Sequence, residues 1–256
     1  MKQIISADNP QYKQLKKLAT SARERRTCGQ TLLDGVHLLQ ALADAGGVVD
    51  LIIVCQGSGG DAQIQRCIER FASALCIELG AALFDAISPV ETPVGILALY
   101  TIPQSDQTTP EFAVLLENIQ DPGNIGAILR TAAAAGVNAV YLSKGCAEAW
   151  SPKVLRAAMG AHFVLAIHEQ QEMQQLCGHL PTVIATHLDA EQSLYDLNLH
   201  GPVAFLFGNE GAGLSRELAE CATNLVRIPM PGKMESLNVA AAAAICLFEW
   251  VRQAHA

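Results

Sequence analysis

The sequence predicts an α/β protein built from two parts, and three observations lead to this fold class. Hydrophobic residues make up 50% of the 256 residues and charged residues 16%, so the chain can bury a sizeable core and is not intrinsically disordered. Short apolar segments alternate with helical patterns along the chain, which is typical of helices packed on a sheet. A polar segment bounded by prolines, 103–110, is the best linker candidate, although a surface loop inside one domain would have the same composition.

The first part, residues 1–102, is predicted to be a small α/β domain. Its expected helices have apolar residues at helical spacing and cover Tyr12–Arg26, Leu32–Ala45 and Ala62–Leu75. Gly46 and Gly47 supply a stop signal for the second of these helices. Its expected strands are the short apolar segments Val48–Cys55, Ala82–Ile87 and Gly95–Ile102.

The second part, residues 111–256, alternates strands and helices. The expected strands are Val114–Glu117, Ala139–Ser143, Phe163–Ile167, Thr182–Thr186, Val203–Phe207 and Leu225–Ile228. The expected helices are Ile125–Ala135, one that starts at Ser151-Pro152, Leu214–Cys221 and the very apolar Ser236–Arg252. This alternation favours a mostly parallel sheet that helices cover on both faces.

The charge of the chain is unevenly distributed. The net charge of −8 excludes a uniformly basic nucleic-acid binder. Residues 1–26, however, hold seven basic against two acidic side chains, a net +5 that leaves −13 for the remainder. Such a segment is either a local nucleic-acid contact or a solvated helix, and the charge alone does not separate these two interpretations.

The cysteines and the apolar segments indicate the compartment. The eight cysteines contain no C-x-x-C pair, so their spacing predicts neither a metal site nor a redox motif. The N-terminus lacks the pattern of a secretion signal, and the longest apolar stretch, Val239–Phe248, is about half a membrane span. We therefore expect a soluble protein of a reducing cytoplasm.

The first stretch with chemical potential joins an expected strand to an expected helix. It runs from Asn118 through the turn Asp121-Pro122-Gly123 to Arg130. Ligands of open α/β sheets bind at the carboxyl ends of strands, and a helix N-terminus there offers unpaired N–H groups. Asn124 is either a plain N-cap or a ligand contact, and Arg130 either forms a surface ion pair or borders the same pocket.

Two further stretches combine glycine or proline with polar side chains. Gly208–Gly213 lies between a buried strand and a helix and carries Glu210, which could cap a helix, bind a ligand or exchange a proton. Its G-x-x-G-x-G spacing differs from the dinucleotide fingerprint, which counts against a dinucleotide-dependent enzyme. Ile228–Val239 is a proline-rich loop that enters an alanine-rich helix, with Ser236 as the expected N-cap and Asn238 in the first turn.

Together, in this order, the three stretches resemble the SpoU-type RNA ribose 2′-O-methyltransferases of the SPOUT superfamily. The matching motifs are N-I-x-D-P-x-N-x-G-x-x-x-R at Asn118–Arg130, G-x-E-x-x-G at Gly208–Gly213 and I-P-M-x-G-x-x-x-S-L-N-V at Ile228–Val239. Leu32–Ala45 looks like part of the L30e-like substrate-binding domain of the same enzymes, with Asp34-Gly35 where the family usually has Glu-Gly. Ala240 stands where the family often has Ser.

The resemblance implies a deep C-terminal trefoil knot whose loops bind S-adenosylmethionine. No metal is implied. By position in the motifs, the implied cofactor-binding residues are Thr186, Leu206, Gly208, Asn209, Gly213, Ile228, Met230, Leu237 and Asn238. The implied reaction is methyl transfer to a ribose 2′-hydroxyl, a poor nucleophile that benefits from a base or from orientation. Arg130 would deprotonate or orient this hydroxyl, and the implied positioning residues are Asn124, Glu210, Ser236 and Asn238.

The resemblance also implies the partners. Such enzymes are homodimers through the knotted domain, and residues of both protomers approach one active site. The basic N-terminal segment gains weight as a contact to tRNA or rRNA, through Lys13, Lys16, Lys17, Arg23, Arg25 and Arg26. The alternative is a non-catalytic RNA-binding or ribosome-assembly protein that has kept the fold, against which the presence of Asn124, Arg130, Glu210 and Asn238 argues.

Overall fold

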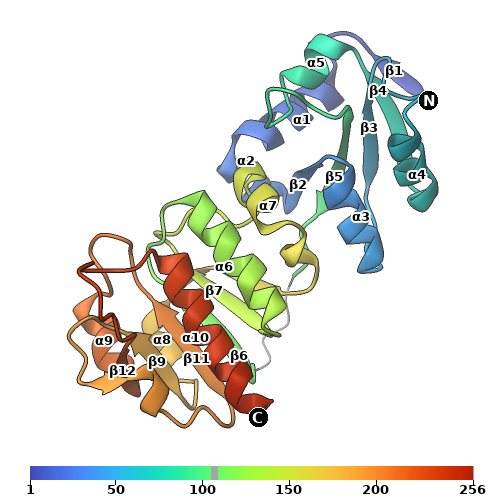
Figure 1. Ribbon diagram of the computed structural model, residues 1–256. Coiled ribbons are helices and arrows are strands. Elements are labelled where there is room, and N and C mark those ends of the chain that lie inside the picture. Colours follow the sequence, from blue (N-terminus) through green and yellow to red (C-terminus); the bar gives the residue numbers. More distant parts are fainter. Residues whose placement is uncertain (105–108, 256) are drawn as a thin grey trace. The chain divides into compact units, whose positions relative to one another are not determined.

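The computed structural model describes residues 1–104 and 109–255, so part of the predicted linker, 105–108, lies outside the described residues. The chain forms two compact units (Figure 1). The first unit comprises Met1–Gln104 and Trp150–Phe163, and the second comprises Ser105–Ala149 and Val164–Ala256. The segment 150–163 thus packs with the first unit, whereas the predicted domain 111–256 includes it. In the described residues, no helix has the length and apolar character needed to cross a membrane.

The first unit is built on a mixed sheet of five strands in the order β1-β4-β3-β5-β2. The strands are β1 (Lys2–Ile4), β2 (Gln30–Asp34), β3 (Leu51–Cys55), β4 (Leu75–Leu79) and β5 (Ile96–Thr101). Only β5 runs antiparallel to its neighbours β2 and β3. The helices are α1 (Pro10–Thr20), α2 (Ala22–Cys28), α3 (Val36–Asp44), α4 (Ala62–Arg70), α5 (Ala81–Asp85) and, from the later segment, α7 (Pro152–Ala158) with the 3-10 turn η1 (Ala161–Phe163).

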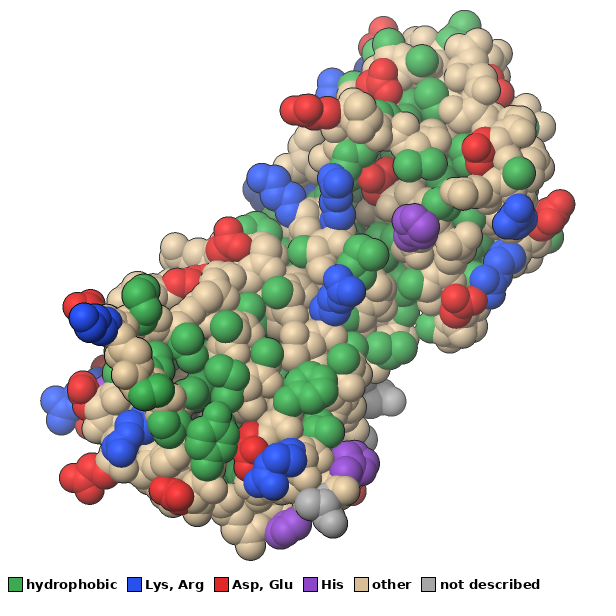
Figure 2. Space-filling model, viewed as in Figure 1, with side chains coloured by type: hydrophobic (Ala, Val, Ile, Leu, Met, Phe, Trp, Pro, Cys, Tyr) green, Lys and Arg blue, Asp and Glu red, His purple; other side chains and the backbone are tan. Residues whose placement is uncertain are grey.

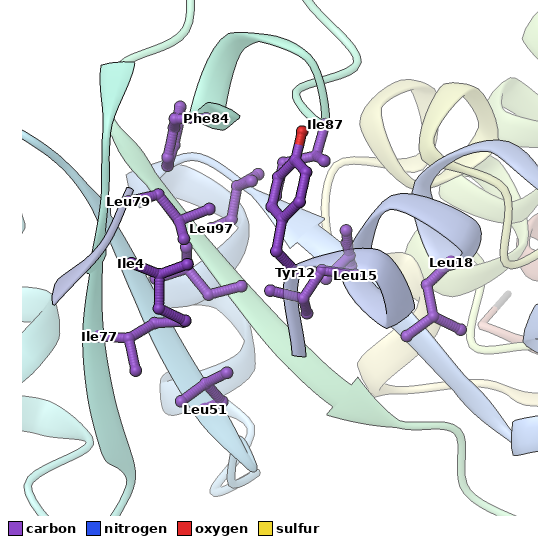
Figure 3. Close-up of a cluster of buried hydrophobic side chains, with 12 residues drawn as sticks. Ile4, Tyr12, Leu15, Leu18, Leu51, Ile77, Leu79, Phe84, Ile87 and Leu97 are labelled. Carbon is purple, nitrogen blue, oxygen red and sulfur yellow. The ribbon is translucent and has the colours of Figure 1, made fainter. Parts of the chain in front are cut away.

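The core of the first unit joins helix α1 to the sheet (Figure 3). Tyr12, Leu15 and Leu18 are spaced three apart, so they share one face of α1, and all three are buried. They belong to the same cluster as Leu79 of β4 and Leu97 of β5. Each such side chain contributes up to about 1.5–3 kcal/mol by leaving water, so α1 is held mainly by this face.

All three helices expected in the first unit differ in extent, and the third, Ala62–Leu75, ends already at Arg70. The segment Tyr12–Arg26 is not one helix, because Ser21 adopts an extended backbone and caps α2 by accepting a hydrogen bond from the Glu24 N–H. The segment Leu32–Ala45 is a helix only from Val36 onward. Its first residues form strand β2, and Gly35 makes the turn between them with a φ of +85° that other residues rarely adopt.

The strands of the first unit were predicted unevenly. The expected strands Val48–Cys55 and Gly95–Ile102 contain β3 and β5. The expected strand Ala82–Ile87 is wrong, because these residues lie in and after helix α5. Strand β4 was not predicted, and only its first residue fell in an expected helix. Its residues pair with both β1 and β3, a tertiary contact that local pattern does not carry.

The second unit is built on a seven-stranded sheet, and every described strand pair in it is parallel. The strand order is β10-β12-β9-β11-β6-β7-β8. The strands are β6 (Phe112–Leu116), β7 (Ala139–Ser143), β8 (Ala166–Gln171), β9 (Val183–Thr186), β10 (Gln192–Ser193), β11 (Val203–Phe207) and β12 (Asn224–Arg227). The helices are α6 (Pro122–Ala134), α8 (Met173–Cys177), α9 (Arg216–Cys221) and α10 (Val239–Ala254), with the 3-10 turn η2 (Leu194–Asp196).

Helices cover both faces of this sheet, as predicted. Leu115 and Leu206 pack with Leu218 of α9 and Met173 of α8 on one face. Phe112 stacks on Trp250 of α10 on the other, with ring centroids 4.0 Å apart. Every residue of β6 and β11 is buried, which explains why these strands are continuous apolar runs in the sequence.

Several elements of the second unit begin or end elsewhere than predicted, and two of these differences have a clear local cause. The strand expected at Phe163–Ile167 begins only at Ala166, because 161–163 forms the 3-10 turn η1. The last helix begins at Val239 rather than Ser236. Its N-cap is Asn238, whose Oδ1 accepts from the N–H groups of Ala240 and Ala241 at 2.9 and 3.4 Å, so Ser236 is not the cap.

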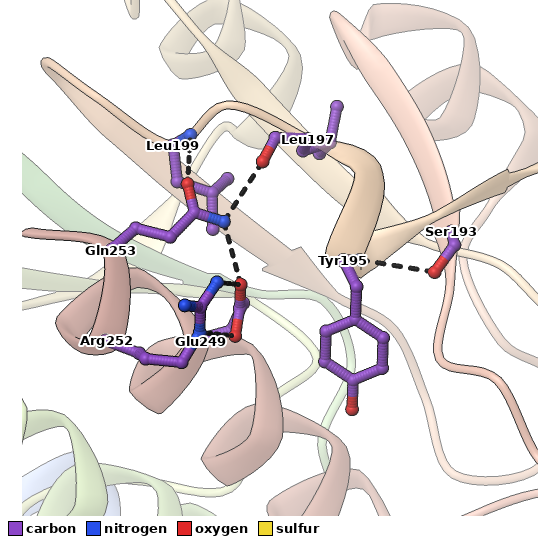
Figure 4. A network of polar contacts seen from close by, with 7 residues as sticks. All are labelled: Ser193, Tyr195, Leu197, Leu199, Glu249, Arg252 and Gln253. Carbon is purple, nitrogen blue, oxygen red and sulfur yellow. Dashed lines mark hydrogen bonds and ion pairs between the residues drawn. The ribbon is translucent and has the colours of Figure 1, made fainter. Parts of the chain in front are cut away.

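The C-terminal end of α10 is fastened to the segment after η2 (Figure 4). The Gln253 amide donates to the Leu197 carbonyl at 3.0 Å and accepts from the Leu199 N–H at 2.9 Å. The same amide donates to Glu249, which also receives two hydrogen bonds from the Arg252 guanidinium at 2.8 and 2.9 Å. These bonds fix the register between α10 and a segment 54 to 56 residues earlier. The trefoil knot itself stays a prediction of the family resemblance.

Candidate active site

Three loops of the second unit enclose a pocket at the carboxyl ends of β9, β11 and β12. Parallel strands end at the same edge of a sheet, which is where open α/β sheets bind ligands. The pocket has a volume of about 350 Å³ and is lined from 186–188, 207–214 and 226–242. It therefore joins the second and third of the stretches that the sequence singled out.

The Gly208–Gly213 loop is folded tightly on itself. The backbones of Asn209 and Gly213 exchange two hydrogen bonds of 2.9 and 3.0 Å, and the Asn209 Oδ1 accepts from the N–H groups of Gly211 and Ala212. A Cβ at Gly208 would lie 2.4 Å from the carbonyl carbon of Gly213, so only glycine permits this closure. Gly208 and Gly213 thus shape the rim of the pocket.

A chain of amide hydrogen bonds ties this loop to the other two stretches. The Asn238 Nδ2 donates to the Asn124 Oδ1 at 2.9 Å, and the Asn124 Nδ2 donates to the Glu210 Oε1 at 2.9 Å. Asn124 is 86 residues from Glu210 and 114 residues from Asn238 along the chain, so the fold brings it to both partners. Both ends of the Asn124 amide are used, which fixes its orientation and that of the Glu210 carboxylate.

The first stretch is anchored by residues beside the predicted ones. Asp121 is the N-cap of α6 and accepts from the Asn124 N–H at 2.9 Å, so Asn124 is not the cap. Asn118 has a φ of +55°, and its carbonyl accepts from the Asn209 amide at 2.8 Å. Glu117 is buried, and its carboxylate accepts from the Ser215 N–H at 2.8 Å. Glu117 was not singled out from the sequence, although its position at the end of an apolar strand is a signal.

Most of the predicted cofactor residues line the pocket. These are Thr186, Gly208, Asn209, Gly213, Ile228, Met230 and Leu237, together with Glu210 and Ser236 from the predicted catalytic set. Asn238 does not, because it caps α10 and donates to Asn124. Leu206 does not either, because it is fully buried in the core beneath α8 and α9. Its neighbour Phe207 lines the pocket instead, since successive side chains of a strand point to opposite faces. His187 and Leu188 also line it and were missed.

Arg130 lies away from the pocket and from the amide network. It lies in the second half of α6, is exposed, and does not line the pocket. It has no hydrogen bond or ion pair to any described residue, in contrast to Asn124 on the same helix. In one chain, the amide network therefore reaches the pocket through Glu210, whereas the Arg130 guanidinium does not reach it.

The basic residues predicted to bind RNA fall in α1 and α2 of the first unit. Lys13, Lys16 and Lys17 are exposed on the face of α1 opposite its buried leucines. Arg23 and Arg26 are exposed as well. Arg25 differs from the prediction, because it is 5% exposed and its guanidinium donates to the Leu18 carbonyl, so its role is structural.

The lining of the pocket suits S-adenosylmethionine. Leu188 and Leu237 are 57% and 40% exposed, which is unusual for leucine and provides apolar surface for an adenine ring. A Cβ at Gly213 would meet no atom within 4 Å, so a ligand can approach the loop backbone there. The volume lies in the ordinary range for small-molecule sites, roughly 300–1,000 Å³.

Comparisons with known proteins show the family of the chain. Residues 111–248 match the model of the SpoU rRNA Methylase family, and residues 9–98 match that of the MRM3-like substrate binding domain. An uncharacterized tRNA/rRNA methyltransferase of Synechocystis is 36% identical, over 98% of this chain and 93% of its own length. The 23S rRNA (guanosine(2553)-2′-O)-methyltransferase RlmP of Bacillus subtilis is 34% identical, over 97% of this chain and 98% of its own.

A solved structure of a similar protein has the cofactor bound. The AdoMet-bound rRNA methyltransferase from Sinorhizobium meliloti superposes with a TM-score of 0.83 at 28% identity, over 98% of this chain and 97% of that protein. Fold, pocket and motifs therefore agree over nearly the whole sequence. The chain belongs to the SpoU rRNA methylase family and is an S-adenosylmethionine-dependent RNA ribose 2′-O-methyltransferase.

Proposed function

We propose that this chain methylates the ribose 2′-hydroxyl of a guanosine in ribosomal RNA. The observation that carries the proposal is the Asn238–Asn124–Glu210 hydrogen-bond chain at the mouth of a cofactor-sized pocket. The choice of guanosine is supported by the B. subtilis relative, whose name specifies a guanosine of 23S rRNA. We place the reaction in the cytoplasm, where the thiols of the eight cysteines stay reduced.

The proposed reaction forms a bond from O2′ to the methyl carbon and breaks the bond from that carbon to the cofactor sulfur. S-adenosylmethionine supplies the methyl group when bound. The 2′-hydroxyl proton passes to solvent water, because a guanidinium is already protonated and has no lone pair with which to accept it. We therefore assign Arg130 the orientation of the hydroxyl and of the neighbouring phosphate, through its fork of N–H donors.

The residues of the amide network hold the reacting groups in place. Asn238 caps α10 and at the same time donates to Asn124, which couples the start of this helix to the Gly208–Gly213 loop. Glu210, held by Asn124 and by the Asn209 amide, presents a carboxylate of fixed orientation at the pocket rim. Fixed geometry of this kind lowers the entropic part of the barrier.

We infer that the working form is a homodimer through the second unit. The outward side of α10 carries a stripe of Ala241, Ala244, Ile245, Phe248 and Val251, with Phe248 47% exposed. Figure 2 shows hydrophobic side chains gathered over this part of the second unit. A contiguous apolar surface of this kind favours a protein partner. A second copy of the chain would also bring its own Arg130 toward the pocket.

We further propose that the functional division follows the sequence, with 1–102 binding RNA and 111–256 carrying out methyl transfer. The exposed cations of α1 and α2 suit the phosphate backbone, which supplies much of the affinity for nucleic acids. Reversing the charge of Lys16, Lys17 and Arg26 should weaken RNA binding and leave cofactor binding unchanged. A loss of cofactor binding in that variant would contradict the division.

The decisive experiment uses rRNA from a strain that lacks the gene. The purified protein and labelled S-adenosylmethionine are incubated with this RNA, and 2′-O-methylated positions are mapped. We expect one guanosine to be modified by the wild type and none by Glu210→Gln. Tight RNA binding by a wild type that transfers no methyl group would instead support the non-catalytic alternative.

A further inference from the structure

A second pocket lies wholly within the first unit, outside the residues assigned to methyl transfer. It has a volume of about 550 Å³, which exceeds that of the cofactor pocket. Its walls come from the end of β2, the start of α3, the segment 90–94 and helix α7. Because α7 belongs to the first unit, one compact body forms this pocket.

The pocket holds a carboxylate whose hydrogen bonding is incomplete. Asp34, the last residue of β2, lines the pocket, and its Oδ1 is buried without any hydrogen-bond partner. Burial raises the pKa of this carboxyl to about 6, and the charge of Arg156 acts in the opposite direction. An unpaired buried acceptor costs stability, so its retention points to a donor that arrives with a ligand.

The remaining walls define the rest of that ligand. Val94 and Met159 are 54% and 56% exposed, and they offer apolar surface to a flat ring. Met159 also has a φ of +51°, an unfavourable backbone conformation that positions it at the end of α7. Arg156 is exposed in the same pocket and provides a cation at its rim, while the exposed Glu91 suits ribose hydroxyls rather than phosphate.

We propose that this pocket binds an unpaired guanine nucleotide of the RNA substrate, with the Asp34 carboxylate accepting from the base and Arg156 contacting its phosphate. Among the four RNA bases, only guanine presents two adjacent N–H donors, N1–H and the N2 amino group, which match the two oxygens of a carboxylate. Unstacked bases in single-stranded loops are the usual target of sequence-specific RNA recognition. The site would anchor the RNA by a base, in addition to the phosphate contacts of α1 and α2.

The test is calorimetric titration of the full-length protein with guanosine and with the four nucleoside 5′-monophosphates. We expect GMP to bind at least about tenfold more tightly than AMP, CMP or UMP. Asp34→Asn should remove this preference, because the amide N–H₂ opposes the guanine donors. Arg156→Gln should weaken all four monophosphates and leave the affinity for guanosine unchanged.

The controls are variants of the exposed ion pair Arg70–Asp44 in the first unit and a variant of the amide network in the second unit. Asp44→Asn and Arg70→Gln repeat the charge changes at a surface pair 2.7 Å apart and should change nothing. Asn124→Ala should keep GMP binding, and a loss there would place GMP in the active site and overturn the proposal. Equal affinity for the four nucleotides, or an unaltered Asp34→Asn variant, would also overturn it.

RNA hairpins distinguish a nucleotide within RNA from a free nucleotide. Hairpins with a single loop G or a single loop A are compared, and we expect the G hairpin to bind more tightly by a factor that Asp34→Asn abolishes. Binding of GMP without discrimination between hairpins would refute the RNA assignment and indicate a free guanine nucleotide. The inference rests on the RNA substrate of the proposed function, but these binding readouts do not depend on methyl transfer. Their failure is therefore separable from failure of the catalytic assignment.

Discussion

Asn124 shows how one side chain can decide the geometry of the whole site. Its amide accepts from Asn238 and donates to Glu210, and these two partners belong to different loops around the cofactor pocket. No other rotation of the amide satisfies both partners, because only one end can donate. The functional weight of the first stretch therefore lies in the position of this amide rather than in helix capping, which Asp121 performs.

Asn124→Ala should lower methyl transfer about 100-fold, because the Glu210 carboxylate and the start of α10 lose their common anchor. Cofactor affinity, measured by calorimetry, should change much less, since Asn124 does not line the pocket. Asn124→Asp should be as damaging at neutral pH, because a second carboxylate would face Glu210. Asn198→Ala, an exposed asparagine that makes only a local turn contact, should behave as the wild type. Equal loss of activity in the Asn198 control would show that the effect is not specific.

Asp34→Asn should stabilise the protein near neutral pH, by on the order of 1–2 kcal/mol after allowance for partial exposure. The folded pKa of about 6 lies above the ordinary carboxyl value of 3.8, so the folded state binds the proton more strongly. Stability from this group is complete below pH 3.8 and is lost as the pH rises through 6. Urea unfolding at pH 4 and pH 8 should therefore show a gain for the variant only at pH 8. A variant that is less stable than the wild type at pH 8 would mean that the carboxylate has an internal partner.

At the scale of elements, the sequence predicted best those that are buried on every side. The strands Ala139–Ser143 and Val203–Phe207 agree with the prediction at both ends, because a continuous apolar segment between turns has one interpretation in a parallel sheet. Strand β4 was not predicted and helix α5 was misassigned, since both are short and their form depends on neighbours far along the chain.

For the site, the sequence motifs pointed to the loops, but the role of a single side chain in them depends on contacts far along the chain. The glycine and amide motifs pointed to three loops that the structure brings together. Leu206 was chosen where Phe207 lines the pocket, a difference of one residue that reverses the face of a strand. The helix start was placed at Ser236 because serine is a good cap. Asn238 takes that role because its amide is also held by Asn124, a contact 114 residues away.

Glu249→Gln tests how firmly the end of α10 is held. We expect the variant to be less stable at neutral pH, because two charge-assisted hydrogen bonds from Arg252 are weakened. Those hydrogen bonds lower the pKa of Glu249 below its ordinary value of 4.5. Its contribution is therefore present above pH 4.5 and is lost as the pH falls through the lowered pKa. The variant and the wild type should converge in urea unfolding at acid pH. Glu220→Gln, in the exposed pair with Arg216, should cost less than about 0.5 kcal/mol at any pH.

At the scale of the whole molecule, the placement of Arg130 is the main constraint on how the enzyme is assembled. One chain holds a complete amide network and a cofactor-sized pocket, yet its predicted orienting arginine is exposed on α6 and does not reach that pocket. The apolar stripe of α10 offers a surface on which a second copy can bind. A site completed by the arginine of the partner reconciles the two observations, and an isologous dimer would contain two such sites.

Subunit mixing separates this arrangement from a site formed by one chain. Arg130→Ala and Glu210→Gln are each expected to be inactive, and the two variants are unfolded together and refolded at equal concentration. If Arg130 and Glu210 meet across the interface, half of the dimers are mixed and each has one intact site, so about a quarter of wild-type activity should return. If both residues act within one chain, no mixed dimer contains an intact site and no activity should return. Phe248→Glu should abolish recovery, because a charge in the apolar stripe prevents dimerisation, which analytical ultracentrifugation would show directly.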